Sequence, residues 1–323
     1  MSDTPDKPTE KPAERPYVLH MFTASPQMSP FDVNMAADAG YQVIVPYCNV
    51  EARMVANLTQ DAIFSRGPKG VSRTGIFIGG RDVMLAADML DAARKAMVPP
   101  FEVSVFADPS GSYTTAAALV ALVERHLAKA YGMELGGKRV LILGGTGAVG
   151  RVAAAMAASL GADVSIASHA GHARAASVSE EINQRFGILT KGVSTATQAE
   201  RRAALAETEI VFATALAGVQ VASTEDLAHA RHLLIAADVN AVPPEGIAGV
   251  NVVNDGKPIA GHANAAGGSG ATDAIGIGAL AIGNVKYQVE HRLFIRMRTG
   301  GKPVYLGFPE AFDEARAVAA GLD

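Results

Sequence analysis

The sequence is poor in cysteine, in long hydrophobic runs and in excess charge of either sign. Cys48 is the only cysteine among 323 residues, which excludes a disulfide within the chain and a metal site made of several cysteines. No run approaches the roughly 20 apolar residues that cross a bilayer, and the formal net charge of −4 lacks the basic excess of a nucleic-acid-binding protein. We therefore expect a cytoplasmic protein with a small-molecule ligand and no metal, membrane or nucleic-acid partner.

The apolar residues that are present occur in short runs that alternate with helical segments. This order predicts an α/β protein with mostly parallel sheets. In the first part of the chain, strands are expected at Tyr17–Phe22, Tyr41–Tyr47, Thr74–Gly80 and Phe101–Asp108. Helices are expected there at Ser29–Ala39, Asp82–Met97 and Ser112–Tyr131.

A second series of strands and helices begins after a Gly-Gly pair at residues 136–137. Its strands are expected at Lys138–Leu143, Ala162–Ala167, Glu209–Thr214, His232–Ala237 and Gly249–Asn254. Its helices are expected at Ala148–Leu160 and Ala173–Phe186. A glycine-rich hinge at Gly261–Gly270 and a long helix from about Thr272 to Arg298, which folds back onto the first part, follow this series.

A glycine-rich loop joins the first strand and helix of the second series. Its residues are Gly145, Thr146, Gly147, Ala148, Val149 and Gly150, in the pattern G-x-G-x-x-G. In such a loop the first glycine permits a tight turn, the second lets the backbone approach a pyrophosphate, and the third lets the helix pack on the strand. A tight turn without a ligand is the alternative. The order of strand, loop, small-residue helix and strand favours a Rossmann-type domain that binds a dinucleotide.

Two domains are the natural expectation for a chain of this length. We expect a first α/β domain over residues 17–135 together with about 272–323, and a Rossmann-type domain over residues 136–271. Residues 1–16 mix proline with both charges and contain no apolar stretch. We therefore expect a disordered tail there and not a signal peptide.

The strand that follows the glycine loop favours NADP, with NAD as the other possibility. A dehydrogenase selective for NAD usually has an acidic residue at the end of this strand, where it binds the ribose 2′-hydroxyl. Here the segment contains Ser168, His169 and Arg174 and no acid, so it offers hydrogen bonds and positive charge to a 2′-phosphate. The alternative is that these residues only solvate a loop and a helix face.

Polar and small residues also follow later strands, and ligands of open α/β sheets bind at the carboxyl ends of strands. Thr214 and Ala215 would let a nicotinamide ribose lie close, and Asp238 and Asn240 would meet the nicotinamide or the substrate. Turn formation before two prolines is the alternative role of Asp238 and Asn240.

The first domain has polar strand ends as well, and these predict a substrate site. The residues are Thr23, Ser25, Asp82, Asp108, Ser112, Thr114 and Thr115. Helix capping is the alternative role for Ser112 and for the two aspartates.

These segments together resemble the methylene-tetrahydromethanopterin dehydrogenases of methylotrophic bacteria. The resemblance extends over about residues 17–292 and is most specific in two elements, residues 111–118 (GSYTTAAA) and residues 238–244 (DVNAVPP). Other matching segments are residues 29–32 (SPFD), 65–67 (SRG), 76–82 (IFIGGRD), 145–150 (GTGAVG) and 276–278 (GIG).

The resemblance implies oxidation of the methylene bridge of methylene-tetrahydromethanopterin to methenyl, with NADP or NAD as the acceptor, in one-carbon (formaldehyde) oxidation. It implies two α/β domains with the pterin between them, and a homo-oligomer, either a trimer or a hexamer. Phe31 and Asp32 would contact the substrate, and Lys286 matches a family lysine near it. Related folate enzymes carry a Tyr-x-x-x-Lys pair, but here Tyr47 is followed by Glu51 at that spacing.

The chemistry implied by the resemblance needs no general base. The hydride leaves a carbon between two nitrogens, and the product is a delocalised cation. The protein must position the two reactants and stabilise the positive charge, for which Asp108 and Asp32 are the candidates. A methylenetetrahydrofolate dehydrogenase, a non-catalytic NADP-binding sensor and a quinate- or shikimate-type dehydrogenase are the alternatives, although no lysine–aspartate pair typical of the last is evident.

Overall fold

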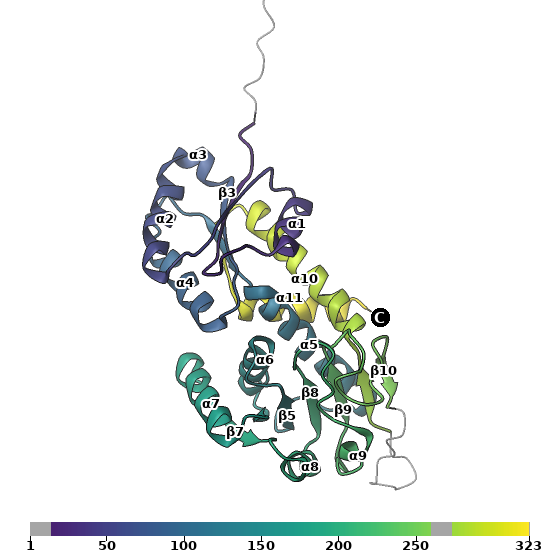
Figure 1. Cartoon of the computed structure of the whole chain (residues 1–323). Helices are drawn as coiled ribbons and strands as arrows, with labels where there is room; N and C mark the ends of the chain where they lie inside the picture. The colour runs from purple at the N-terminus through teal and green to yellow at the C-terminus, as the bar shows by residue number, and fades with distance from the viewer. Residues whose placement is uncertain (1–13, 260–272, 323) are drawn as a thin grey trace, which may run out of the picture.

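The computed structural model describes residues 14–259 and 273–322 and contains two sheets, each with helices packed on it (Figure 1). The predicted α/β class with two parallel sheets is therefore confirmed. The predicted hinge at Gly261–Gly270 and the first 13 residues of the predicted tail lie outside the described residues. Within the described ranges, no helix combines the length and the apolar character needed to cross a membrane.

The first sheet is fully parallel and has the strand order β12-β4-β3-β1-β2. Its strands are β1 (Val18–Phe22), β2 (Val43–Tyr47), β3 (Thr74–Ile78), β4 (Ser104–Ala107) and β12 (Tyr305–Leu306). The helices around it are α1 (Pro30–Asp38), α2 (Ala52–Phe64), α3 (Gly67–Val71), α4 (Val83–Lys95), α5 (Ser112–Tyr131), α10 (Ala279–Thr299) and α11 (Phe308–Ala320). The central strand β3 is buried along its whole length, as expected for a parallel strand that is covered on both faces.

The second sheet has the order β10-β11-β9-β8-β5-β6-β7, and only the edge strand β10 is antiparallel. Its strands are β5 (Arg139–Leu143), β6 (Asp163–Ser168), β7 (Thr190–Ser194), β8 (Ile210–Ala213), β9 (Ile235–Asp238), β10 (Asp255–Pro258) and β11 (Ile275–Ile277). Its helices are α6 (Ala148–Ser159), α7 (His172–Phe186), α8 (Gln198–Ala206) and α9 (Thr224–Leu227). The strand order reverses between β5 and β8, and in such sheets this switch point is where a dinucleotide binds.

Two sequence predictions for the second sheet are wrong. Gly249–Asn254 forms no strand, and β11 occupies the position beside β9 instead. The long helix begins at Ala279 and not near Thr272, because Ile275–Ile277 belongs to the sheet. Three residues are too few to show a strand pattern in the sequence, and the apolar stretch around them favours a helix.

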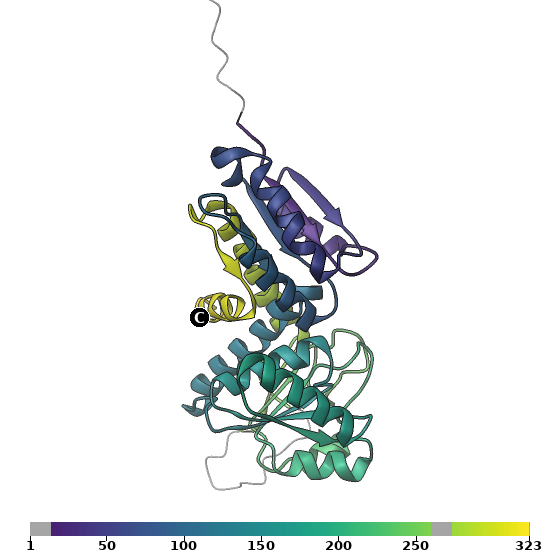
Figure 2. The same ribbon diagram turned by 90° about the vertical axis from the view of Figure 1, so that its left-hand side faces the viewer.

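The C-terminal part of the chain packs on the first sheet, as predicted. Phe294 of α10 contacts Phe77 and Phe106 of the sheet, with ring centroids 5.2 Å apart in both pairs. After α10 the chain adds the edge strand β12 and then α11, which packs against α5. Figure 2 shows this C-terminal part, in yellow, beside the rest of the first sheet. Neither β12 nor α11 was predicted from the sequence.

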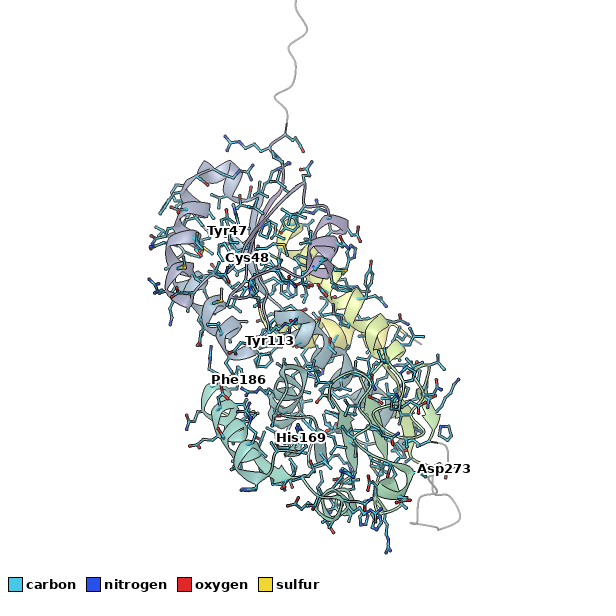
Figure 3. The ribbon with its side chains drawn as sticks, in the orientation of Figure 1. Tyr47, Cys48, Tyr113, His169, Phe186 and Asp273 are labelled. Carbon is cyan, nitrogen blue, oxygen red and sulfur yellow. The ribbon has the colours of Figure 1, made fainter. Side chains whose placement is uncertain are left out.

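Helices α4, α7 and α11 connect the two halves of the molecule. Phe308, the first residue of α11, packs against Tyr113 of α5 and Phe186 of α7, with centroids 5.8 and 4.9 Å apart. Figure 3 shows Tyr113 and Phe186 in the region between the two sheets. Arg185 of α7 also forms ion pairs with Asp88 and Asp91 of α4, at 3.4 and 2.8 Å.

Candidate active site

A cavity of about 760 Å³ lies at the carboxyl ends of β1, β3 and β4 in the first sheet. Its lining consists of Ser25, Pro26, Gln27, Ser29, Pro30, Phe31, Asp32, Gly80, Arg81, Ser110, Gly111 and Lys286. Ser110 ties two of the strand ends together, because its hydroxyl donates a 2.7 Å hydrogen bond to the Gly80 carbonyl. Four of the predicted site residues, Ser25, Phe31, Asp32 and Lys286, therefore line one cavity.

Asp108 anchors the start of α5 beside this cavity. It is completely buried, and its carboxylate accepts hydrogen bonds from the backbone N–H groups of Tyr113 and Thr114 and from the Thr114 hydroxyl. Burial raises the pKa of Asp108, while Lys286 and the bonds from Thr114 and Tyr113 oppose this shift. The alternative role of Ser112 as N-cap is not realised, because the cap residue is Gly111. The alternative role of Asp108 is realised, because its carboxylate accepts the bonds at the start of α5.

Lys286 reaches the cavity from α10, which packs on β4 and α5. Its ammonium lies 3.7 Å from the centre of the Phe31 ring, a cation–π contact. Gly111 leaves room for it: a Cβ there would lie 3.0 Å from Lys286 Cε and 3.2 Å from Nζ. The backbone of Gly111 also has a φ of +66°, so a side chain at this position would strain the backbone and crowd Lys286.

A third buried carboxyl group, which the sequence analysis did not identify, completes the cluster. Glu290 lies one turn after Lys286 on α10, is completely buried, and accepts a hydrogen bond from the Lys286 ammonium. Burial and the nearby Asp108 raise the pKa of Glu290 to about 7, although Lys286 opposes this. The i, i+4 spacing of a lysine and a glutamate was the only signal in the sequence, and it usually marks an exposed pair.

Asp32 on α1 is the least satisfied of the three carboxyl groups. It is 2% exposed, and its Oδ2 atom has no hydrogen-bond partner. Burial first, then the charges of Glu290 and Asp108, raise the pKa of Asp32 to about 8, while Lys286 lowers it. Three buried carboxyl groups thus share the positive charge of Lys286 at one wall of the cavity.

The remaining residues predicted for this site lie around the cavity and not in its wall. Thr23 is buried, and its hydroxyl accepts a hydrogen bond from the backbone of Ser25. Asp82 caps α4 by accepting hydrogen bonds from two backbone N–H groups, which is the alternative role given above. Thr114 is held by Asp108, and Thr115 is half-buried on α5. Direct substrate contact by these four residues stays a prediction.

The glycine loop has the geometry expected of a pyrophosphate cradle. A Cβ at Gly150 would lie 2.6 Å from Gly145 Cα and 2.7 Å from Thr214 Oγ1, so α6 packs directly on the turn. Gly147 is the exposed N-cap residue of α6, and no side chain caps this helix. The first N–H groups of α6 are therefore available to an anion, and Thr146, Ala148 and Val149 provide the backbone around them.

The end of β6 carries the residues predicted to choose between cofactors. Ser168 is buried and its hydroxyl accepts a hydrogen bond from the backbone of Ala170. His169 is exposed at the end of the strand (Figure 3), and Arg174 is exposed in the first turn of α7. Both side chains are exposed to solvent, and contact of His169 and Arg174 with a cofactor stays a prediction.

Asp238 and Asn240 brace the loop after β9. Asp238 is buried and accepts hydrogen bonds from the backbone of Asn240 and of Ile247, and burial raises its pKa. The amide of Asn240 accepts from Gly218 and Val242 and donates to Pro244. The alternative role in turn formation is therefore realised, while contact with a ligand remains a prediction, as it does for Thr214 and Ala215.

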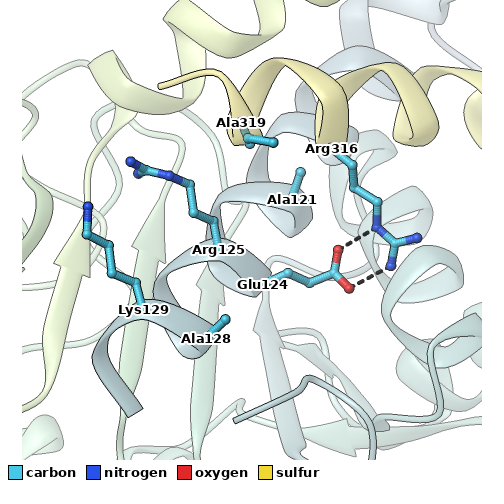
Figure 4. Close-up of a pocket in the computed structure, with 8 residues that line it drawn as sticks. Ala121, Glu124, Arg125, Ala128, Lys129, Arg316 and Ala319 are labelled. Carbon is cyan, nitrogen blue, oxygen red and sulfur yellow. Dashed lines mark hydrogen bonds and ion pairs between the residues drawn. The ribbon is translucent and has the colours of Figure 1, made fainter. Parts of the chain in front are cut away.

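Another cavity of about 640 Å³ lies between α5 and α11, away from the strand ends (Figure 4). Its floor is made of alanines, and Arg316 forms a two-pronged ion pair with Glu124 across it. In the described part of the chain, no group of three or more histidine, cysteine, aspartate or glutamate side chains is arranged to hold a metal ion.

Comparison with known proteins shows which family the chain is similar to. A family model described as "Methylene-tetrahydromethanopterin dehydrogenase, N-terminal" matches residues 30–110. The NAD(P)-dependent methylenetetrahydromethanopterin dehydrogenase of Methylorubrum extorquens is 46% identical over 94% of this chain and 98% of its own length. The bifunctional protein MdtA of the same organism is 34% identical over 82% of this chain and 88% of its own length.

A solved structure shares the fold at low sequence identity. The ligand-free 5-ketofructose reductase of Gluconobacter sp. strain CHM43 superposes with a TM-score of 0.50 and 16% identity, over 94% of this chain and 99% of that chain. At this identity the likeness concerns the arrangement of the two sheets and their helices, and function must be argued from the site.

Proposed function

The chain belongs to the family of methylenetetrahydromethanopterin dehydrogenases, and on this premise we propose that it transfers a hydride from methylene-tetrahydromethanopterin to NADP or NAD. The product is methenyl-tetrahydromethanopterin, in one-carbon oxidation. The observation that carries this proposal is the cavity lined by Phe31, Asp32 and Lys286, with Asp108 and Glu290 buried behind it. The 46% sequence identity between this chain and the Methylorubrum enzyme, over 94% of this chain, supports the substrate class.

The second sheet would hold the cofactor. The backbone from Gly145 to Gly150 and the free N–H groups of α6 would bind the pyrophosphate, since a Cβ at Gly150 would fill the turn. Ser168, His169 and Arg174 would meet a 2′-phosphate, which favours NADP over NAD. When bound, the nicotinamide supplies the acceptor for the hydride.

Helix α10 would bring the two binding sites together. It begins at Ala279, directly after the carboxyl end of β11, and Lys286 follows seven residues later. At 1.5 Å per residue this is about 10 Å along the helix. The carboxyl edge of the second sheet thus lies within a small-molecule length of the cavity in the first, as hydride transfer between two bound reactants requires.

The cavity wall would stabilise the charge that develops on the substrate. Removal of a hydride from the methylene carbon leaves a cation spread over two nitrogens. The carboxylate of Asp108, held in place by Thr114 and the start of α5, would attract this charge. Asp32 would do the same when it is ionised, and Lys286 would donate a hydrogen bond to an acceptor atom of the pterin. Positioning and electrostatics thus suffice without a general base.

The domain assignment follows from the same proposal. Residues 17–135 with the C-terminal residues from Ala279 would bind the pterin, and the second sheet with its helices, including β11 (Ile275–Ile277), would bind NADP. We also propose that the protein is a cytoplasmic homo-oligomer, either a trimer or a hexamer, which light scattering of the purified protein would test.

The proposed reaction is tested by the absorbance of the reduced nicotinamide. Methylene-tetrahydromethanopterin is offered first with NADP and then with NAD, and methylene-tetrahydrofolate follows with both. Fast reduction with the methanopterin supports the proposal and ranks the cofactors. Reduction with the folate alone makes the protein a methylenetetrahydrofolate dehydrogenase, and binding of NADP without any reduction points to a sensor.

A further inference from the structure

Glu290 occupies a position that a carboxylate rarely takes without a functional reason. It is completely buried on α10, its Oε2 atom accepts a hydrogen bond from Lys286, and its Oε1 atom has no partner. Burying a carboxylate costs free energy unless it is fully paired. Since a leucine at this position would fill the same space without that cost, the packing of α10 does not explain the residue.

The neighbouring groups confine the Lys286 ammonium. The Phe31 ring lies 3.7 Å away on one side, and Gly111 lies close on another. Glu290 holds it from behind, within α10 itself. The other charged groups nearby are Asp108 at the start of α5, Asp32 on α1 and Arg81, which lines the same cavity.

An unpaired ammonium in this wall would hinder the reaction. Hydride transfer makes the bound pterin a cation, and charges in a poorly solvated site repel each other more strongly than in water. We propose that Glu290 is a positioning residue, which fixes Lys286 and cancels its charge so that Lys286 binds the pterin without opposing the cation. This inference rests on the proposed function and assigns a role to a residue that does not line the cavity.

The pKa of Glu290 is raised to about 7, so the cancellation of the Lys286 charge depends on pH. Burial raises it most, Asp108 raises it further, and Lys286 lowers it. Near neutral pH, the negative charge on Glu290 therefore depends on the ammonium that it holds. The pair carries no net charge where Glu290 is ionised, above about pH 7, and replacement of either member removes this neutrality.

The test compares Glu290→Gln, Lys286→Met and the double variant with the wild type. Glu290→Gln keeps the shape and a hydrogen-bond acceptor but removes the charge. We expect kcat to fall about 10- to 100-fold, the range of one to two pKa units for a nearby charge, with KM for NADP unchanged. Binding of the cationic methenyl pterin should weaken more than binding of the neutral methylene pterin.

The control is Glu314→Gln, which removes the exposed ion pair between Arg292 of α10 and Glu314 of α11. This pair is not part of the cavity, and we expect the control to leave kcat and the ratio of the two pterin affinities unchanged. In the Lys286→Met background, Glu290→Gln should cause no further loss of kcat. Equal weakening of both pterins, or additive losses of kcat in the double variant, would overturn the proposal.

Thermal unfolding separates this inference from the proposed reaction. Each single variant should lower the unfolding midpoint, because it leaves one buried group without its partner, and the double variant should recover part of the loss. If the wild type turns over no pterin, the proposed function fails, and the midpoints still report on the pair. Independent, additive shifts of the midpoint would overturn the pairing itself.

Discussion

The Thr114 hydroxyl donates a 2.6 Å hydrogen bond to Asp108 Oδ2, and both side chains are completely buried. This bond opposes the rise in the pKa of Asp108 that burial causes. Thr114→Val should therefore raise that pKa further and lower the free energy of unfolding by about 1–3 kcal/mol. Denaturant unfolding measures the loss. Thr59→Val is the control, because the buried Thr59 hydroxyl has no partner and its removal should cost almost nothing.

Asp32 should make the protein less stable as the pH rises. Its pKa is raised from 3.8 to about 8 in the folded state, so the native protein keeps a proton that the unfolded chain releases. The stabilising effect of this proton is complete below pH 3.8 and is lost as the pH rises through about 8, by up to about 1.4 kcal/mol per pH unit.

Asp32→Asn removes this slope, since asparagine is neutral at every pH. We expect the variant to gain stability relative to the wild type between about pH 4 and pH 8 and then to stay level. Unfolding curves across this range measure the difference. The exposed Asp38 at the end of the same helix supplies the control Asp38→Asn, and parallel pH profiles for wild type and Asp32→Asn would contradict the prediction.

Gly150→Ala should damage the cofactor site. The new Cβ would lie 2.6 Å from Gly145 Cα and 2.7 Å from Thr214 Oγ1, so α6 must move away from the turn. We expect a loss of about 1–3 kcal/mol in unfolding free energy and about tenfold weaker NADP binding, measured by calorimetry. Gly283→Ala is the matched control. Gly283 lies in α10 with nothing near its Cβ position, and alanine favours a helix there, so this variant should lose neither stability nor NADP binding.

Arg174 should contribute to the preference for NADP. It is exposed in the first turn of α7, where its charge would meet a 2′-phosphate. Arg174→Ala should raise KM for NADP about tenfold and leave KM for NAD unchanged. Lys191 forms an exposed ion pair with Asp163 at the start of their strands, and Lys191→Ala should alter neither constant. If Arg174→Ala raised KM for NADP and KM for NAD equally, Arg174 would have no role in the choice between the two cofactors.

Several strands could be predicted from the sequence because their burial shows in their composition. β1, β3, β5 and β8 are short apolar runs, and the glycine loop follows β5 at the expected position. β7 was missed because Thr190–Ser194 is half-exposed at the sheet edge and has few apolar residues. Its place is set by pairing with β6, which is a tertiary interaction.

The sequence also indicated some residues of the candidate site and not others. Polar residues after strands indicated Asp108, and the family resemblance indicated Phe31 and Lys286. The sequence does not indicate that Glu290 belongs to the site, because a glutamate four residues after a lysine on a helix is usually exposed. Only the packing of α10 against α5 and the first sheet shows that it is buried. Capping also decided between roles that the sequence left open, as for Asp82.

Helix α10 fixes the position of the proposed pterin site relative to the second sheet. Ala279 at the edge of the second sheet and Lys286 in the wall of the cavity belong to one uninterrupted helix. Their separation and their relative rotation are therefore set by helix geometry and not by loops. One residue inserted between them would turn Lys286 by about 100° around the helix axis and point its ammonium away from the cavity, so this interval tolerates substitution but not a change in length.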